Sequence, residues 1–151
     1  MTDTAHFAKP SALERLFNRG FGLLVGIGMA PPDYYLLQVR GRKSGRTRST
    51  PVNVIRVRNR QFLVAPRGTT QWVRNVGETR ELLLKRGRSR RRFRVWSVPN
   101  ADKPEILRAY LDRFRTTVQR YFPIPAGSSA AEFAPLAERY PVFELLDVTS
   151  T

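Results

Sequence analysis

The sequence predicts an α+β fold in which six mostly antiparallel strands curl into a small barrel with flanking helices. The strand-like segments are short, and tight turns rather than crossover helices join most of them. Such strands close into a barrel more readily than they form a doubly wound parallel sheet. The 151 residues, 41% of them apolar, can bury one core. We expect residues 1–10 to be a flexible N-terminus and residues 11–151 to form a single domain.

The first half of the chain predicts one helical segment followed by three strands. Ser11 and Glu14 have the spacing of a capping box, and the helix that they begin should end near Gly28. Alternation of apolar residues then predicts strands. The strands and turns expected here are Tyr34–Arg40, a basic turn at 41–45, a strand at 48–58 with Val52, Val54 and Ile55 inward, a reversal at Asn59 and Arg60, and a strand at 61–65.

The second half predicts a short helix, a hairpin, a long helix and a closing strand. A loop at 66–70 precedes a helical turn at 71–76 that Gly77 should end, and strands at 81–85 and 91–98 flank Gly87. Asp102 is expected to cap the long helix, with Pro104 in its first turn. Its apolar stripe is Ile106, Leu107, Tyr110, Leu111, Phe114 and Val118. A linker at 123–129, a short helix at 130–139 and a strand at 142–148 complete the chain.

The net charge of +15 is concentrated in the middle of the sequence. Residues 34–101 hold 18 Lys or Arg and two acids, whereas the rest of the chain is close to neutral. Such a field attracts nucleic acid, anionic lipid or a ligand with several negative groups; an ordinary solvated basic surface is the alternative. Nucleic acid is disfavoured, because aromatic residues are not interleaved with the basic runs.

Few side chains could carry out chemistry by themselves. The chain has no cysteine, and His6 is its one histidine. Thiol nucleophiles, a Ser-His-Asp triad and multi-histidine or thiolate metal sites are therefore excluded or poorly provided for. We assign no catalytic residue and no metal ligand, and we expect a cofactor to supply the difficult step.

Two motifs suggest how an anionic ligand would be held. The first is Gly41-Arg42-Lys43-Ser44-Gly45-Arg46, followed by Arg48, Thr50 and Pro51. Its glycines permit a tight turn whose backbone N–H groups can point at one anion, and its cations can bind phosphate or carboxylate. An ordinary basic hairpin turn is the alternative, and the spacing does not match a Walker phosphate loop.

The second motif is Ala65-Pro66-Arg67-Gly68, which leads into Trp72-Val73-Arg74-Asn75. Trp72 and Asn75 lie three residues apart and therefore share one face of a helical turn. The alternative is that Trp72 packs in the core and Asn75 caps a loop.

Together these motifs resemble the deazaflavin-dependent nitroreductase family, whose members include quinone reductase-like proteins. The resemblance covers residues 34–96 with few gaps and resumes at Tyr140-Pro141-Val142-Phe143-Glu144-Leu145. It implies a split β-barrel of the FMN-binding kind, with coenzyme F420, an 8-hydroxy-5-deazaflavin, delivering hydride to quinones or nitroaromatic compounds. FMN is the less favoured cofactor.

The resemblance also implies which residues bind the cofactor. These are Arg42, Lys43, Ser44, Gly45, Arg48, Thr50, Pro51, Ala65, Pro66, Arg67, Gly68, Trp72 and Asn75. It assigns no role to the seven basic residues of the hairpin 85–94, and it does not align Tyr110, Tyr121 or Tyr140 with known substrate-shaping tyrosines.

Partners and location follow from the same reasoning. We expect a small-molecule substrate and a cytoplasmic protein that is a monomer or homodimer. A non-catalytic protein that binds F420 or a fatty acid remains the alternative. It would contact the inner face of an anionic membrane through the short apolar segment 21–30.

Overall fold

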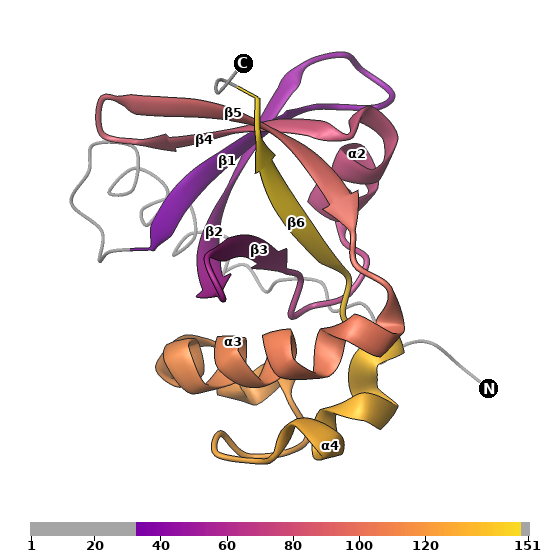
Figure 1. Ribbon diagram of the computed structural model, residues 1–151. Coiled ribbons are helices and arrows are strands. Elements are labelled where there is room, and N and C mark those ends of the chain that lie inside the picture. The colour runs from indigo at the N-terminus through magenta and orange to yellow at the C-terminus, as the bar shows by residue number, and fades with distance from the viewer. Residues whose placement is uncertain (1–32, 149–151) are drawn as a thin grey trace.

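The computed structural model describes residues 33–148 of the chain (Figure 1). The expected flexible segment 1–10, the helix beginning at Ser11 and the apolar segment 21–30 lie outside the described residues. None of the described helices is long and apolar enough to cross a membrane.

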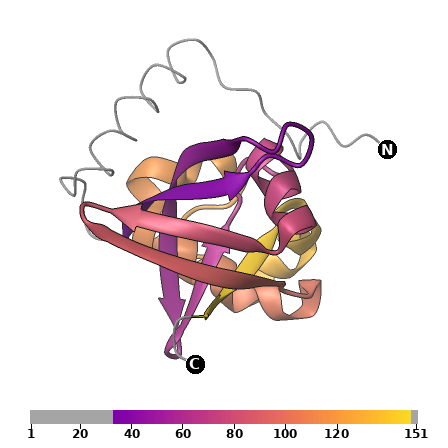
Figure 2. The same cartoon turned by 90° about the horizontal axis from the view of Figure 1, so that it is seen from above.

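The centre of the protein is a closed barrel of six strands in the order β1-β2-β3-β6-β5-β4. Every pair of neighbouring strands is antiparallel, which confirms the predicted fold class. Figure 2 shows the ring of strands from above, with the β4–β5 hairpin extending beyond it. The strands are β1 Tyr34–Arg40, β2 Thr47–Val57, β3 Arg60–Val64, β4 Glu81–Arg86, β5 Ser89–Ser97 and β6 Val142–Asp147.

Alternation along the strands divides the apolar side chains between two cores. The inner set fills the barrel and includes Leu37, Val54 and Leu63, which are almost fully buried. The outer set lies between the barrel and the helices, and it includes Ile55 and Phe62. Val52, Val54 and Ile55 are all buried as predicted, but Ile55 faces the helices because adjacent strand residues point to opposite faces.

The reversal between β2 and β3 lies one residue earlier than predicted. Arg58 and Asn59 occupy its centre with positive φ angles of 53° and 67°, and Arg60 is already part of β3. Two-residue hairpin turns of this kind need positive φ at both central positions. The pair of residues that takes this conformation therefore fixes the β2–β3 register.

Helix α2, Gln71–Thr79, is longer than predicted and packs against β1 and β4. Gly77 lies inside it and does not end it, which corrects the sequence-based expectation. The helix ends at Arg80, whose φ of 59° is left-handed and whose N–H donates to the carbonyl of Val76. Tertiary packing thus overrides the local tendency of glycine to interrupt a helix.

Helix α3, Lys103–Val118, forms a layer beneath the barrel with α4, Ala130–Phe133 (Figure 1). Short 3₁₀ turns adjoin them, and the predicted helix at 130–139 is divided between α4 and the 3₁₀ turn Ala134–Arg139. All six residues of the predicted apolar stripe of α3 are buried. Asp102 precedes α3 as predicted, but its side chain makes no capping hydrogen bond because the turn Asn100–Asp102 places it in helical backbone geometry.

Candidate functional site

The turn between β1 and β2 is closed by its own hydrogen bonds. The N–H of Gly41 donates to the carbonyl of Arg46 over 2.7 Å, and the N–H of Gly45 donates to the carbonyl of Gly41 over 2.9 Å. The N–H of Arg46 donates to Oγ of Ser44 over 3.1 Å. These three amides are therefore engaged inside the turn, and the side chains of Arg42 and Lys43 add positive charge beside it.

Glycine is needed at two positions of this turn for different reasons. A Cβ on Gly41 would lie 2.9 Å from Oγ of Ser44, which is too close, and 3.2 Å from the carbonyl oxygen of Arg46, which is a tight contact. Gly45 has a φ of +73°, which favours a residue without a Cβ. The turn can therefore keep its shape only with these glycines in place.

Asn75 joins the turn to helix α2. Its Oδ1 accepts hydrogen bonds from the backbone N–H of Arg42 over 3.1 Å and from Nη1 of Arg42 over 2.9 Å. The same Nη1 donates to Oε1 of Gln71 over 2.9 Å. Asn75 is 4% exposed. Because Gln71 and Asn75 lie one helical turn apart, α2 holds the Arg42 guanidinium from two points.

A cavity of about 550 Å³ opens between this turn and α2. Its walls are cationic and polar on the turn side and carry the Trp72 ring on the helix side. The lining residues that were predicted from sequence are Arg42, Lys43, Ser44, Arg48, Thr50, Arg67, Trp72 and Asn75. The two motifs, about 25 residues apart in the chain, therefore meet in one site.

A second cavity of about 560 Å³ lies between the barrel and the helical layer. Pro51, Ala65 and Pro66 line it, together with Tyr110 and Tyr121. Both cavities share the residues Thr50, Arg67, Thr70 and Trp72. The two spaces are thus adjacent, one bordered by cations and the other mainly by apolar and aromatic side chains.

The junction of the cavities contains an unsatisfied polar atom. Oγ1 of Thr70 is buried, yet it has no hydrogen-bond partner in residues 33–148. Thr70 occupies the N-cap position of α2 with extended backbone, but its hydroxyl makes no capping bond. Nδ2 of Asn53, beside the second cavity, is also buried without a partner there. Buried polar groups are rarely left unpaired, so both atoms suit a bound polar molecule.

Eleven of the 13 predicted residues line one cavity or both. Gly45 and Gly68 shape the flanking turns, each with positive φ. The lining residues that the prediction missed include Val39, Ser49, Thr70 and Gln71 in the first cavity, and Asn53, Thr117 and Arg120 in the second. Of these missed residues, Thr70 was the one that the sequence could have indicated, because threonine directly before a helix is a common capping residue.

Tyr110, Tyr121 and Tyr140, to which the family resemblance assigned no role, lie in two different environments. Tyr110 and Tyr121 line the second cavity. Burial raises the pKa of the Tyr110 hydroxyl well above its ordinary value, with smaller effects from Tyr34 and Tyr121. Tyr140 is instead buried in the outer core, where its hydroxyl donates to the carbonyl of Tyr121 over 2.5 Å. Tyr140 therefore supports the wall of the cavity without lining it.

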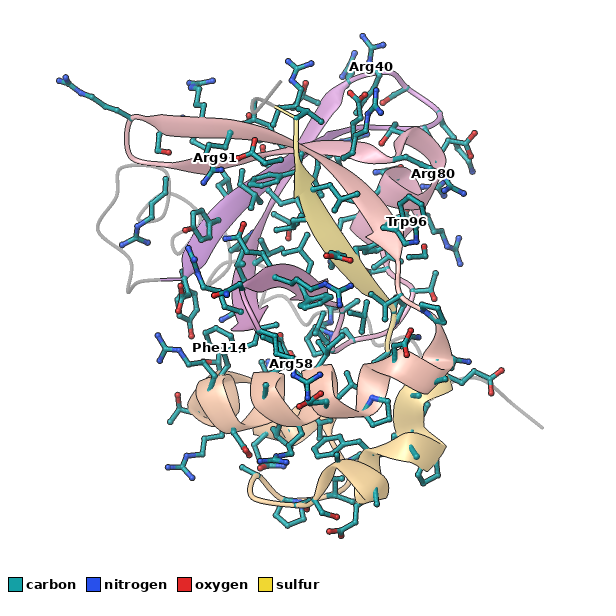
Figure 3. The ribbon with its side chains drawn as sticks, in the orientation of Figure 1. Arg40, Arg58, Arg80, Arg91, Trp96 and Phe114 are labelled. Carbon is teal, nitrogen blue, oxygen red and sulfur yellow. The ribbon has the colours of Figure 1, made fainter. Side chains whose placement is uncertain are left out.

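The basic hairpin lies away from both cavities. Arg91 pairs with Asp147, whereas Arg90, Arg92 and Arg94 are exposed, on the opposite face from buried Phe93 and Val95. Figure 3 shows Arg40, Arg80 and Arg91 on the part of the barrel remote from α3, whereas Arg58 lies beside it. Across residues 33–148, no cluster of His, Asp and Glu side chains has the arrangement of a metal site.

Solved structures share this fold at low sequence identity. An F420-H2 dependent reductase superposes with a TM-score of 0.51 at 14% identity, covering 76% of this chain and 94% of the other. A domain-swapped dimer gives 0.53 at 15% identity, covering 88% and 92%. A NimC/NimA family protein from Clostridium acetobutylicum gives 0.52 at 12% identity, covering 84% and 77%. Among curated proteins, no sequence match was found.

A family model for F420H(2)-dependent quinone reductase matches residues 14–122, which include both motifs and both sets of cavity-lining strands. The cationic cavity and the unpaired Thr70 hydroxyl fit a phosphorylated, acidic cofactor with a polar ring system. This chain therefore belongs to the F420H(2)-dependent quinone reductase family, and it is an oxidoreductase that uses coenzyme F420.

Proposed function

We propose that this protein transfers hydride from reduced F420 to a small planar acceptor of the quinone or nitroaromatic class. The observation that supports this proposal most strongly is the junction of the two cavities at Thr50, Arg67, Thr70 and Trp72. Hydride transfer requires the donor and acceptor to be in contact, and two adjoining cavities, of which the first is lined by more cations, provide such an arrangement.

The cationic cavity would hold the phosphorylated and acidic part of the cofactor. Lys43 and Arg48 supply exposed positive charge, and Arg42 is fixed in position by Gln71 and Asn75. A pre-positioned guanidinium loses little conformational freedom when it binds an anion. Thr70 at the junction would give its unsatisfied hydroxyl to the polar edge of the ring.

The second cavity would take the acceptor. Pro51, Ala65 and Pro66 form an apolar wall, and Tyr110 and Tyr121 contribute aromatic surface on the opposite side. Flat aromatic acceptors gain most from such walls through burial and ring stacking. Its volume of about 560 Å³ lies within the ordinary range for small-molecule sites.

The bound cofactor supplies the hydride, and the protein's residues position the reactants and exclude water. The acceptor also needs a proton after it has received the hydride. The raised pKa of Tyr110 makes its hydroxyl a weak acid, so we assign the proton to solvent.

The experiment is a fluorescence titration of the purified protein with F420 and, in parallel, with FMN, at low and physiological salt. We expect saturable F420 binding that is tighter than FMN binding and persists at physiological salt. Steady-state reduction of a naphthoquinone and of a nitroaromatic compound by reduced F420 then tests the acceptor.

Each outcome has a distinct meaning. Tight F420 binding without turnover of either acceptor would reject the acceptor class and retain the cofactor site. Binding of FMN alone, or of neither cofactor, would reject the assignment of the cationic cavity.

A further inference from the structure

The outer face of strands β3, β5 and β6 is only partly covered by the helical layer. The outward residues Phe62, Val64 and Val142 are buried with the helices in the outer core. Further along the same face, Trp96 on β5 pairs with Glu144 on β6, and Arg94 pairs with Leu146. This second part of the sheet extends beyond α3 (Figure 1), and its outward residues Trp96, Arg94 and Leu146 are exposed.

Two large apolar side chains are exposed on this part of the sheet. Trp96 is 64% exposed and Leu146 is 37% exposed, and no other large apolar residue of the described chain is exposed. Figure 3 shows the Trp96 side chain directed away from the barrel. The pairing of β5 with β6 makes the two side chains diagonal neighbours. Covering an exposed tryptophan and an adjacent exposed leucine with another surface would be favourable, because it removes apolar area from water.

Both residues border a groove above the helical layer with a volume of about 820 Å³. Its apolar floor is formed by Val57, Phe62, Val98, Pro99 and Ile106. We call the groove and its two exposed residues the Trp96 face. None of the residues that line it lines either cofactor cavity, so its function can be tested separately from theirs.

The Trp96 face is electrically balanced in a strongly basic protein. Three acids and three arginines line the groove, namely Asp102, Glu105 and Glu144, and Arg58, Arg60 and Arg108. Arg58 pairs with Glu105 over 3.0 Å, and Arg60 pairs with Glu144 over 2.6 Å. These three acids are a quarter of the 12 in the chain, whose net charge is +15. The groove is therefore balanced in charge, and Arg94, the cross-strand partner of Leu146, adds one positive charge beside it.

We propose that the Trp96 face is the contact surface between two copies of this chain. In a two-fold dimer the same patch meets itself, so it must be self-complementary in charge as well as in shape. A neutral patch containing both signs meets this condition. Two copies would repel each other through their arginine-rich surfaces. A membrane or a nucleic acid would instead favour those cationic surfaces over a groove that contains three acids.

The direct test measures the sedimentation coefficient of the whole protein by analytical ultracentrifugation at concentrations between about 0.1 and 100 µM. We expect a monomer–dimer equilibrium. Leu146→Arg should weaken dimerisation at least about tenfold, because it places like charges opposite each other at the centre of the contact. Ser89→Arg adds the same charge at the exposed tip of the β4–β5 hairpin and should leave the equilibrium unchanged.

Fluorescence provides a second measurement that locates the contact. The chain has two tryptophans, so Trp72→Phe leaves Trp96 as the single reporter. Its emission should shift to shorter wavelength as the protein concentration rises through the dissociation constant. Added NaCl should strengthen the dimer, because it screens repulsion between two +15 chains while the apolar contact persists.

Three results would overturn the proposal. One is a monomer at every concentration with red-shifted Trp96 emission. Another is blue-shifted emission that does not depend on concentration, which would mean that a segment of the same chain covers the face. The third is a dimer that Leu146→Arg leaves intact, which would place the contact elsewhere. Thermal unfolding of Leu146→Arg, measured alongside, excludes loss of fold as the cause of dissociation.

Discussion

The backbone N–H and the guanidinium of Arg42 both donate to one oxygen atom, Oδ1 of Asn75, over 3.1 and 2.9 Å. This contact joins the β1–β2 turn to helix α2 across 33 residues of sequence. We propose that Asn75 acts through this contact, by fixing the position of the Arg42 guanidinium that would face the cofactor. We therefore regard Asn75 as a positioning residue.

Replacing Asn75 with Ala should weaken F420 binding at least about tenfold and destabilise the protein by about 1–3 kcal/mol, because two donors of Arg42 lose their acceptor. Asn75→Asp retains the oxygen acceptor and should restore most of the affinity. Fluorescence titration and urea unfolding measure the two effects. Equal affinities for Asn75→Ala and the wild type would contradict the positioning role.

Reversing charge in the turn should abolish F420 binding without unfolding the protein. We expect this of Arg42→Glu combined with Lys43→Glu, because both side chains line the cationic cavity. The matched control is Arg90→Glu combined with Arg92→Glu, which changes the charge equally on exposed residues of β5. If the control lost as much affinity as the turn variant at physiological salt, general electrostatic attraction would explain binding and the specific site would be rejected.

Two glycine substitutions should change stability in opposite directions. Gly77→Ala should stabilise the protein by about 0.5–1 kcal/mol, because Gly77 is helical and nothing lies within 4 Å of an added Cβ. Gly41→Ala should destabilise it and weaken F420 binding, since the new Cβ would meet Ser44 and the Arg46 carbonyl. Chemical denaturation of the ligand-free proteins checks both signs.

The variant Thr70→Val tests whether the Thr70 hydroxyl binds the ligand or stabilises the fold. Because Oγ1 of Thr70 is buried and unpaired in residues 33–148, its removal should leave the ligand-free protein equally stable or more stable. The same variant should bind F420 less tightly, by about five- to tenfold, if the hydroxyl contacts the cofactor. A lower melting temperature in the ligand-free state, with unchanged affinity, would show a structural role instead.

The acid stability of the barrel should depend on Glu144. The hydrogen bond from Arg60 lowers the pKa of the Glu144 carboxyl below its ordinary value, with a smaller Coulombic contribution from the same residue. A carboxyl whose pKa is lowered by folding contributes stability above its unfolded pKa of about 4.3 and loses it as the pH falls through the folded pKa.

Glu144→Gln should therefore flatten the decline of melting temperature below about pH 4.5. Arg60→Gln should have the same effect, and the double variant should add little more, because one ion pair is responsible. Melting curves between pH 3 and 7 test this. A decline in both single variants as steep as in the wild type would refute it.

The sequence by itself determined the local structure and the chemical class of the ligand. Alternation defined all six strands to within a few residues, and helical spacing defined the buried stripe of α3. The glycines and cations of the turn 41–46 indicated an anion site, because those residue types have direct consequences for backbone conformation and charge. The two motifs together identified the family.

Only the tertiary structure decided which distant residues meet. β1 pairs with β4, and β3 pairs with β6, through contacts that no local pattern encodes. Helix α2 packs against β1 and continues past Gly77, and this packing places Asn75 within hydrogen-bond distance of Arg42. The amides of Gly41, Gly45 and Arg46 donate hydrogen bonds within the turn that was predicted to bind an anion. Local preferences act over a few residues, whereas strand pairing and burial act across the whole chain, and the contacts of the site depend on the latter.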